Sequence, residues 1–184
     1  VMLAAFVGVG ICGVAAGIGA FRGILSSTPT IRLSDVVAVG EATIVYDKEG
    51  NEIDQYVSTN SNRLSVGMDE IPDYLGKAFV AIEDQRFYQH NGIDVKGILR
   101  AGYQFLKTGG EEAQGASTIT QQLLKNTVFT DWTSEGDNKI KKIKRKIQEQ
   151  YLALEITKYY SKDEILLRYM NAINLGQNTL GVES

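Results

Sequence analysis

The sequence predicts a mainly α-helical domain with a small β element at its front, preceded by one transmembrane helix. The first 21 of the 184 residues contain no Asp, Glu, Lys, Arg or His, so all 19 basic and 22 acidic side chains follow them. A β-branched segment comes next at Thr43–Tyr46, and from Tyr74 onward apolar residues recur mainly at helical spacing. A helix of 21 residues is ~31 Å long at ~1.5 Å per residue, which is enough to cross the core of a bilayer.

The apolar N-terminal segment is longer than the core of a cleaved signal peptide. Such a core has roughly 7–15 residues and precedes a small-residue cleavage site, and no A-x-A site follows Phe21. We therefore expect residues 1–22 to be a retained, single-pass membrane anchor. Arg22 and Arg32 are the basic residues before Lys48, and such sparse positive charge is typical of the side that faces away from the cytoplasm.

Residues 23–41 are predicted to be a linker, and residues 42–184 to form one domain that is long enough to bury a core. The single cysteine, Cys12, lies in the apolar segment, so the chain has no intrachain disulfide and no cysteine-based metal site. The net charge of −3 argues against a general nucleic-acid-binding surface.

The domain is predicted to begin with a β-hairpin and to continue as helices. Turn-forming residues 47–51 separate Thr43–Tyr46 from a second strand that starts at Ile53. Thr118-x-x-Gln121 and Ser161-x-x-Glu164 match capping boxes, which mark helix starts. Periodicity and capping together predict helices over residues 74–90, 94–106, 118–129, 139–159 and 161–173.

Two of these predicted helices are amphipathic. In the helix over residues 139–159, one face carries Ile140, Ile143, Ile147, Tyr151 and Leu154. In the helix over residues 161–173, the residues expected in the core are Ile165, Leu166, Tyr169 and Ile173. The tail from Asn174 is punctuated by glycine and predicts no further element.

A first cluster of chemistry-bearing residues surrounds Glu83, in the helix over residues 74–90. On a helix, Glu83, Phe87 and His90 fall near one face. The like charge of Asp84 and partial burial beside Phe87 are conditions that suit a general base or acid near neutral pH. The alternative is a surface carboxylate next to a histidine at a helix end, and the residues alone leave both interpretations open.

A second cluster, Gly115–Gln122, lies at a predicted helix start. Its hydroxyl groups and the unpaired backbone N–H groups of such a start can bind an anion. Lys125 lies four residues beyond Gln121 on the same face and would add a positive charge. The alternative is simply a well-capped helix.

A third cluster is the basic run Lys139–Lys146, which places six positive charges in eight residues and is followed by Glu149. On an amphipathic helix behind a membrane anchor, this run suits a pyrophosphate or anionic lipid head groups, at about 1 kcal/mol per basic residue near an anionic surface. The alternative is a solvated face in which Arg145 and Glu149 form a helix ion pair worth a few tenths of a kcal/mol.

In this order, and behind an apolar segment, these clusters resemble the peptidoglycan glycosyltransferase domain of bifunctional (class A) penicillin-binding proteins. The resemblance covers roughly residues 42–183. It rests on four motifs in register: Glu83-Asp84-x-x-Phe87-x-x-His90-x-Gly92, Gly115-x-Ser117-Thr118-Ile119-Thr120-Gln121-Gln122, Arg145-Lys146-x-x-Glu149 and Lys162-x-x-Ile165-x-x-x-Tyr169-x-Asn171. The family's fifth motif and its transpeptidase domain would lie beyond Ser184, so we expect a C-terminally incomplete domain.

The resemblance implies a lysozyme-like fold with two lobes, and a reaction outside the cytoplasmic membrane of a bacterium. The growing glycan strand is the donor, lipid II is the acceptor, and undecaprenyl pyrophosphate leaves. Glu83 would be the general base that deprotonates the acceptor 4-hydroxyl, and Glu149 would be the second catalytic glutamate. The residues that would bind the substrate are Asp84, His90, Ser117, Thr118, Gln121, Gln122, Lys125, Arg145 and Lys146.

The resemblance also implies several partners. A divalent cation, Mg²⁺ or Mn²⁺, would assist the leaving diphosphate, and Glu149 would either orient groups or hold this metal. Inhibitors of the moenomycin type and other cell-wall synthesis proteins would bind, and nucleic acid would not. Most of the fourth motif would shape the core rather than react.

Two other functions compete with this one. A lytic transglycosylase or another lysozyme-like hydrolase would use the glutamate first as an acid, and it would have no diphosphate to stabilise. Neutralising Lys125 and Arg145 should then matter little. A non-catalytic cell-wall binding module would tolerate the replacement of Glu83.

Overall fold

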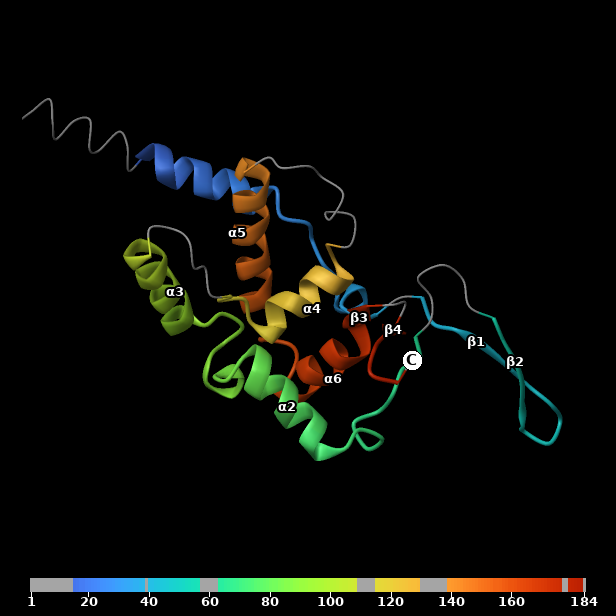
Figure 1. Cartoon of the computed structure of the whole chain (residues 1–184). Helices are drawn as coiled ribbons and strands as arrows, with labels where there is room; N and C mark the ends of the chain where they lie inside the picture. The colour runs from blue at the N-terminus through green and yellow to red at the C-terminus, as the bar shows by residue number, and fades with distance from the viewer. Residues whose placement is uncertain are drawn as a thin grey trace, which may run out of the picture.

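The computed structural model describes residues 15–38, 40–56, 63–108, 115–129, 139–176 and 179–183. It shows a body of helices from which one hairpin projects (Figure 1). The longer helices are α2 (Asp73–Glu83), α3 (Val95–Lys107), α4 (Ile119–Thr127), α5 (Lys139–Ile156) and α6 (Lys162–Ala172), and short 3-10 turns occur at η1 (Leu33–Asp35) and η2 (Phe87–Gln89). The predicted mainly helical class is confirmed.

The projecting hairpin confirms the β element expected at the front of the domain. Strands β1 (Thr43–Tyr46) and β2 (Glu52–Tyr56) are antiparallel. The turn between them is organised by Asp47, whose Oδ1 accepts hydrogen bonds from the backbone N–H groups of Glu49 at 2.9 Å and Asn51 at 2.8 Å. A second small hairpin, β3 (Asn174–Gly176) with β4 (Thr179–Leu180), lies in the tail for which the sequence predicts no element.

The first predicted helix of the domain is wrong at its C-terminal end. It was expected to run to residue 90, but α2 ends at Glu83 and is followed by a turn and by η2. Asp84 leaves helical geometry, with φ −158° and ψ 75°. The physical reason is that its carboxylate turns inward, where it is paired with His90 and with the start of α4.

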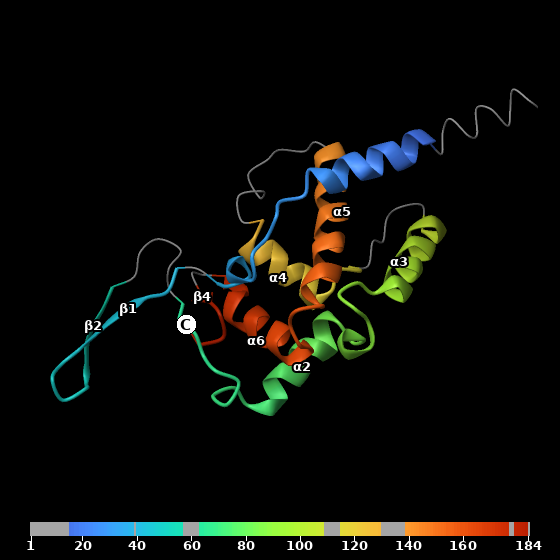
Figure 2. The same cartoon turned by 180° about the vertical axis from the view of Figure 1, so that it is seen from behind.

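The core lies where α4 packs between α5 and α6, as both views show (Figures 1 and 2). Of the core residues predicted for the helix over residues 161–173, Ile165, Leu166 and Tyr169 lie in α6 and are buried, and Ile173, just after α6, packs against the core. From α4, the core receives Ile119, Leu123 and Leu124, and from α5 it receives Leu152, Ala153 and Ile156.

The apolar face of the predicted helix over residues 139–159 is not the buried face. Ile140 and Ile143 are exposed, whereas the polar residues Gln148 and Glu149 are buried. The polar pair can be buried because Glu149 is neutralised by two neighbouring cations, and because Gln148 donates a hydrogen bond to Ser27 Oγ at 3.3 Å. The helix also ends at Ile156, earlier than expected.

Residues 1–14 of the predicted anchor lie outside the described residues, and residues 15–26 form a largely exposed helix. Within the described ranges, no helix combines the length and the apolar character needed to cross a membrane. Part of the predicted linker lies against the helical body. Val36 is fully buried, its carbonyl accepts a hydrogen bond from Arg168 at 3.0 Å, and the Leu33 carbonyl accepts one from Tyr160 at 2.7 Å.

Candidate functional site

The residues of the first three predicted clusters come together around the start of α4, where two hollows adjoin. The first hollow, of about 380 Å³, is lined by residues that include Glu83, Asp84, Arg86, Asp94 and Arg100. The second, of about 290 Å³, is lined by Ser117, Gln121, Gln122, Lys125, Asn126, Arg145, Lys146 and Glu149. Ser117 lines both hollows, so the two are neighbouring parts of one polar surface.

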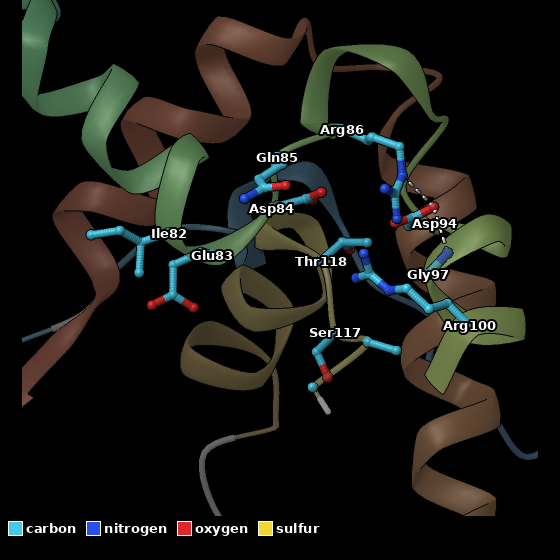
Figure 3. Close-up of a pocket in the computed structure, with 12 residues that line it drawn as sticks. Ile82, Glu83, Asp84, Gln85, Arg86, Asp94, Gly97, Arg100, Ser117 and Thr118 are labelled. Atoms are coloured by element: carbon cyan, nitrogen blue, oxygen red, sulfur yellow. Dashed lines mark hydrogen bonds and ion pairs between the residues drawn. The ribbon is translucent and has the colours of Figure 1, made fainter. Parts of the chain in front are cut away.

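Glu83 is the last residue of α2, and its side chain is exposed at the first hollow (Figure 3). Its Oε2 accepts a hydrogen bond from Gln122 Nε2 at 2.8 Å. The expected partial burial beside Phe87 is wrong, because α2 ends at Glu83 and Phe87 then turns fully into the core. Glu83 is therefore a carboxylate that a bound molecule can reach.

Asp84 points away from Glu83 and into the protein (Figure 3). Its two oxygens lie 3.0 and 2.9 Å from His90 Nε2, and its Oδ2 also accepts the backbone N–H of Ile119 at 3.2 Å. These contacts join the end of α2 to the start of α4 and place Glu83 beside Gln122. The predicted roles of Asp84 and His90 in substrate binding stay predictions, since both side chains here serve internal contacts.

The start of α4 is fixed by the capping box that the sequence predicts. The Thr118 hydroxyl accepts the backbone N–H of Gln121 at 3.2 Å, and the Gln121 side chain accepts that of Thr118 at 3.0 Å. The same hydroxyl donates to the Gly92 carbonyl at 2.6 Å. Both capping side chains are almost completely buried. They therefore hold the helix start in place rather than lying open to a ligand, although Gln121 also borders the second hollow.

Gly92 brings the loop after α2 against α5. Its φ is +92°, and a Cβ placed there would lie 2.2 Å from the Ala153 carbonyl oxygen. The close approach lets the Gly92 carbonyl reach Thr118. Gly92, the glycine of the first motif, is thus required because the loop after α2, the helix α5 and the start of α4 pack closely together here.

The second hollow is dominated by positive charge. Arg145 Nε lies 3.2 Å from Glu149 Oε1, and Lys146 Nζ lies 3.1 Å from Glu149 Oε2 and 2.8 Å from Ser117 Oγ. Glu149 is only 3% exposed. The ion pair between Arg145 and Glu149, which the sequence offered as the alternative to an anion site, is present. It forms part of a hollow lined by cations. Lys125, from the last turn of α4, is exposed at the same hollow.

An ion pair that the sequence does not predict borders the first hollow. Arg86 is paired with Asp94 through two hydrogen bonds, one of them from Nε to Oδ1 at 3.2 Å. Asp94 also caps α3 by accepting the Gly97 backbone N–H at 3.0 Å. The Arg86 hydrogen bond holds the pKa of Asp94 below its usual range. Asp94 was readable as a helix cap, but no local pattern marks Arg86, eight residues earlier, as its partner.

The described residues offer no ready metal centre. In these parts of the chain, no group of three or more His, Cys, Asp or Glu side chains could hold a metal ion. Glu149, the buried acid of the second hollow, has each oxygen paired with a cation instead. Within the described residues, the divalent cation that the resemblance implies therefore stays a prediction.

Residues 49–184 match the family model described as Transglycosylase. The chain is 44% identical over 164 residues to penicillin-binding protein 1A of Clostridium perfringens strain 13, which covers 88% of this chain and 23% of the relative. It is 41% identical over 177 residues to penicillin-binding protein 1A of Clostridium botulinum strain Langeland, covering 95% and 20%. It is 38% identical over 175 residues to penicillin-binding protein 1A/1B of Bacillus subtilis strain 168, covering 94% and 18%. The chain thus spans about a fifth of the length of these relatives.

Proposed function

Because the chain belongs to the transglycosylase family, we propose that it polymerises lipid II into glycan strands in bacterial cell-wall synthesis and releases undecaprenyl pyrophosphate. The observation that carries the proposal is the junction at Ser117. On one side of it lies the exposed Glu83 carboxylate, and on the other lies a hollow lined by three cations. A transfer from a lipid diphosphate needs a base for the acceptor and positive charge for the leaving group.

Glu83 acts on the acceptor, as the general base of the reaction. A sugar hydroxyl is a weak nucleophile near neutral pH, so the 4-hydroxyl of lipid II must lose its proton as it attacks. Glu83 takes that proton. The hydroxyl oxygen forms a bond to C1 of the donor sugar with inversion, and the bond from C1 to the diphosphate oxygen breaks. The electron pair of that bond leaves with undecaprenyl pyrophosphate.

The cations of the second hollow stabilise the leaving group. Lys125, Arg145 and Lys146 supply three positive charges against the single negative charge of Glu149, a net charge of +2 at this surface. The surplus suits a diphosphate whose negative charge grows as the bond to the sugar breaks. A hydrolase that cleaves glycan has no such group to bind, so the surplus favours transfer over cleavage.

Glu149 acts in this proposal by holding cations rather than by taking a proton. It is buried and lies beside both Arg145 and Lys146. These two contacts fix the cationic groups of Arg145 and Lys146 at the hollow. Ser117 adds a hydroxyl that touches Lys146 Nζ where the two hollows meet.

Removing the guanidinium of Arg145 tests the role of the cations. We expect Arg145→Ala to lower the rate of lipid II turnover by about tenfold or more, because hydrogen bonds to a charged group contribute roughly 1.5–3 kcal/mol. Thermal unfolding should change less than turnover, because Lys146 still pairs with the buried Glu149 in this variant. Lys141→Ala is the matched control, since Lys141 belongs to the same basic run but lines neither hollow. Turnover by Arg145→Ala within about twofold of the wild type would mean that the run is a solvated face.

We further propose that residues 1–22 anchor the protein in the cytoplasmic membrane by a single pass, with the domain outside. The charge-free N-terminal segment supports this placement, as does a lipid-linked substrate. Alkaline phosphatase fused after the domain should then be active in a bacterial host. An inactive phosphatase fusion, together with an active cytoplasmic reporter at the same position, would contradict the orientation. The proposed substrates, the moenomycin-type inhibitors and a divalent cation bound with the diphosphate stay predictions.

A further inference from the structure

A buried phenol is connected to Glu83 through one side-chain amide. Tyr169, on α6, is completely buried, and its hydroxyl donates a hydrogen bond to Gln122 Oε1 at 3.3 Å. Gln122, on α4, donates from Nε2 to Glu83 Oε2 at 2.8 Å. The connection therefore crosses three helices and ends on the carboxylate that lines the first hollow.

The phenol ring packs against the same helix that carries Glu83. The Tyr169 ring meets the Phe79 ring edge-on, with centroids 5.6 Å apart and an angle of 85° between the planes. Phe79 lies one helical turn before Glu83 on α2. The aromatic contact fixes the position of the hydroxyl relative to the end of α2, independently of the hydrogen bonds.

The two hydrogen bonds of this connection are both favourable in only one donor-to-acceptor direction, from Tyr169 through Gln122 to Glu83. Burial, and secondarily the negative charge of Glu83, raise the pKa of Tyr169 well above its usual range, so the hydroxyl keeps its proton and can donate. A hydroxyl that donates to the Gln122 carbonyl turns the amide nitrogen toward Glu83. The reversed amide would place its carbonyl oxygen against the carboxylate, which is repulsive.

We propose that Tyr169 is a positioning residue that acts through Gln122 to hold the Glu83 carboxylate toward the first hollow. This inference rests on the proposed function, in which Glu83 is the general base. Glu83 is exposed, and without a fixed donor its side chain would sample several rotamers, of which few suit proton transfer. Gln122 thereby receives a role different from the predicted contact with sugar or phosphate oxygens. The fourth motif, expected to shape the core, receives a direct connection to the site.

Tyr169→Phe tests the inference because it removes one hydroxyl and keeps the ring beside Phe79. We expect kcat for lipid II polymerisation to fall roughly 3- to 10-fold, the scale of one hydrogen bond of about 1 kcal/mol. The KM for lipid II should stay unchanged. The acidic limb of the pH–rate profile should move to higher pH, because the Gln122 amide, no longer fixed by the phenol, donates less steadily to the carboxylate.

A second variant and a matched control separate positioning from folding. Gln122→Met removes the amide but keeps the length of the side chain, and it should lower kcat at least as much. Adding Tyr169→Phe to it should then have little further effect, since the phenol acts through the amide. Tyr160→Phe is the control, because it removes a hydroxyl that donates to the Leu33 carbonyl outside both hollows. It should retain the wild-type kcat.

Three results would overturn the inference. The first is wild-type kcat and an unchanged pH profile in Tyr169→Phe or, if that variant does not fold, wild-type kcat in Gln122→Met. The second is independent, additive losses in the double variant. The third is an equal loss in Tyr160→Phe. Glu83→Gln separates a failure of the positioning role from a failure of the proposed function. If it polymerises normally, the proposed function itself fails, whereas an inactive Glu83→Gln beside a fully active Tyr169→Phe removes the positioning role alone.

Discussion

Replacing Glu83 with glutamine is expected to lower the rate of lipid II polymerisation by about 100-fold or more, the usual scale for the loss of a general base. Glutamine keeps the size of the side chain and can still accept the hydrogen bond that Gln122 donates. It cannot take up the proton of the acceptor hydroxyl. Binding of lipid II, or of moenomycin, should therefore persist while turnover is lost. The measurement is the conversion of labelled lipid II to glycan, separated on a gel.

Glu155→Gln is a suitable control for this variant. Glu155 lies on α5 and is paired with Lys158, outside the two hollows. The same chemical change there should leave polymerisation at the wild-type rate. Wild-type amounts of polymer from Glu83→Gln would remove Glu83 from the role of base and would favour a non-catalytic binding module.

Gly92→Ala is expected to lower the free energy of unfolding by about 2–5 kcal/mol. A left-handed backbone costs a non-glycine residue roughly 1–2 kcal/mol, and overpacking adds about 1–3 kcal/mol. The new Cβ would lie 2.2 Å from the Ala153 carbonyl oxygen, and backbone atoms cannot rotate out of its way. Urea unfolding of the purified protein measures the effect.

Gly50→Ala separates the two causes of this loss. Gly50 has a similar φ of +89°, but a Cβ there meets no heavy atom within 4 Å. It should therefore show only the backbone cost, roughly 1–2 kcal/mol. Equal losses in Gly50→Ala and Gly92→Ala would mean that the contact between the loop and α5 is not tightly packed, and that Gly92 does not fix the start of α4 by close approach.

Features set by neighbouring residues were predictable from the sequence. The capping boxes at Thr118 and Ser161 form as expected, because each needs only a hydroxyl and a side chain three residues later. The β1–β2 hairpin follows from turn residues between two β-branched or aromatic segments. In α6, helical spacing identified the buried face because Ile165, Leu166 and Tyr169 pack against α4.

Features set by distant partners were not predictable. The early end of α2 depends on Asp84 meeting Ile119, a residue 35 positions away. The buried face of α5 contains Gln148 and Glu149, whose burial depends on contacts with other segments and on paired cations, so apolar periodicity indicated the opposite face. Period alone does not show which side of a helix the rest of the chain will cover.

In the candidate site, too, local features were predictable from the sequence and long-range contacts were not. The residues of its motifs were identifiable one by one, and the structure brings Glu83, Ser117 and Lys146 to adjoining hollows. Their connections were not identifiable, because Lys146 contacts Ser117 from 29 residues away and Tyr169 contacts Gln122 from 47 residues away. The spacing within a motif carries no information about such pairs.

In the proposed function, the two hollows together perform glycosyl transfer from a lipid diphosphate. The most direct measurement is to incubate the protein with labelled lipid II and to analyse both the glycan and the released lipid. We expect a ladder of glycan polymer, with one undecaprenyl pyrophosphate released for each unit added, and the loss of both products in Glu83→Gln. Failure to form polymer from lipid II, together with cleavage of preformed glycan strands, would mean that the site cleaves glycan rather than transferring it.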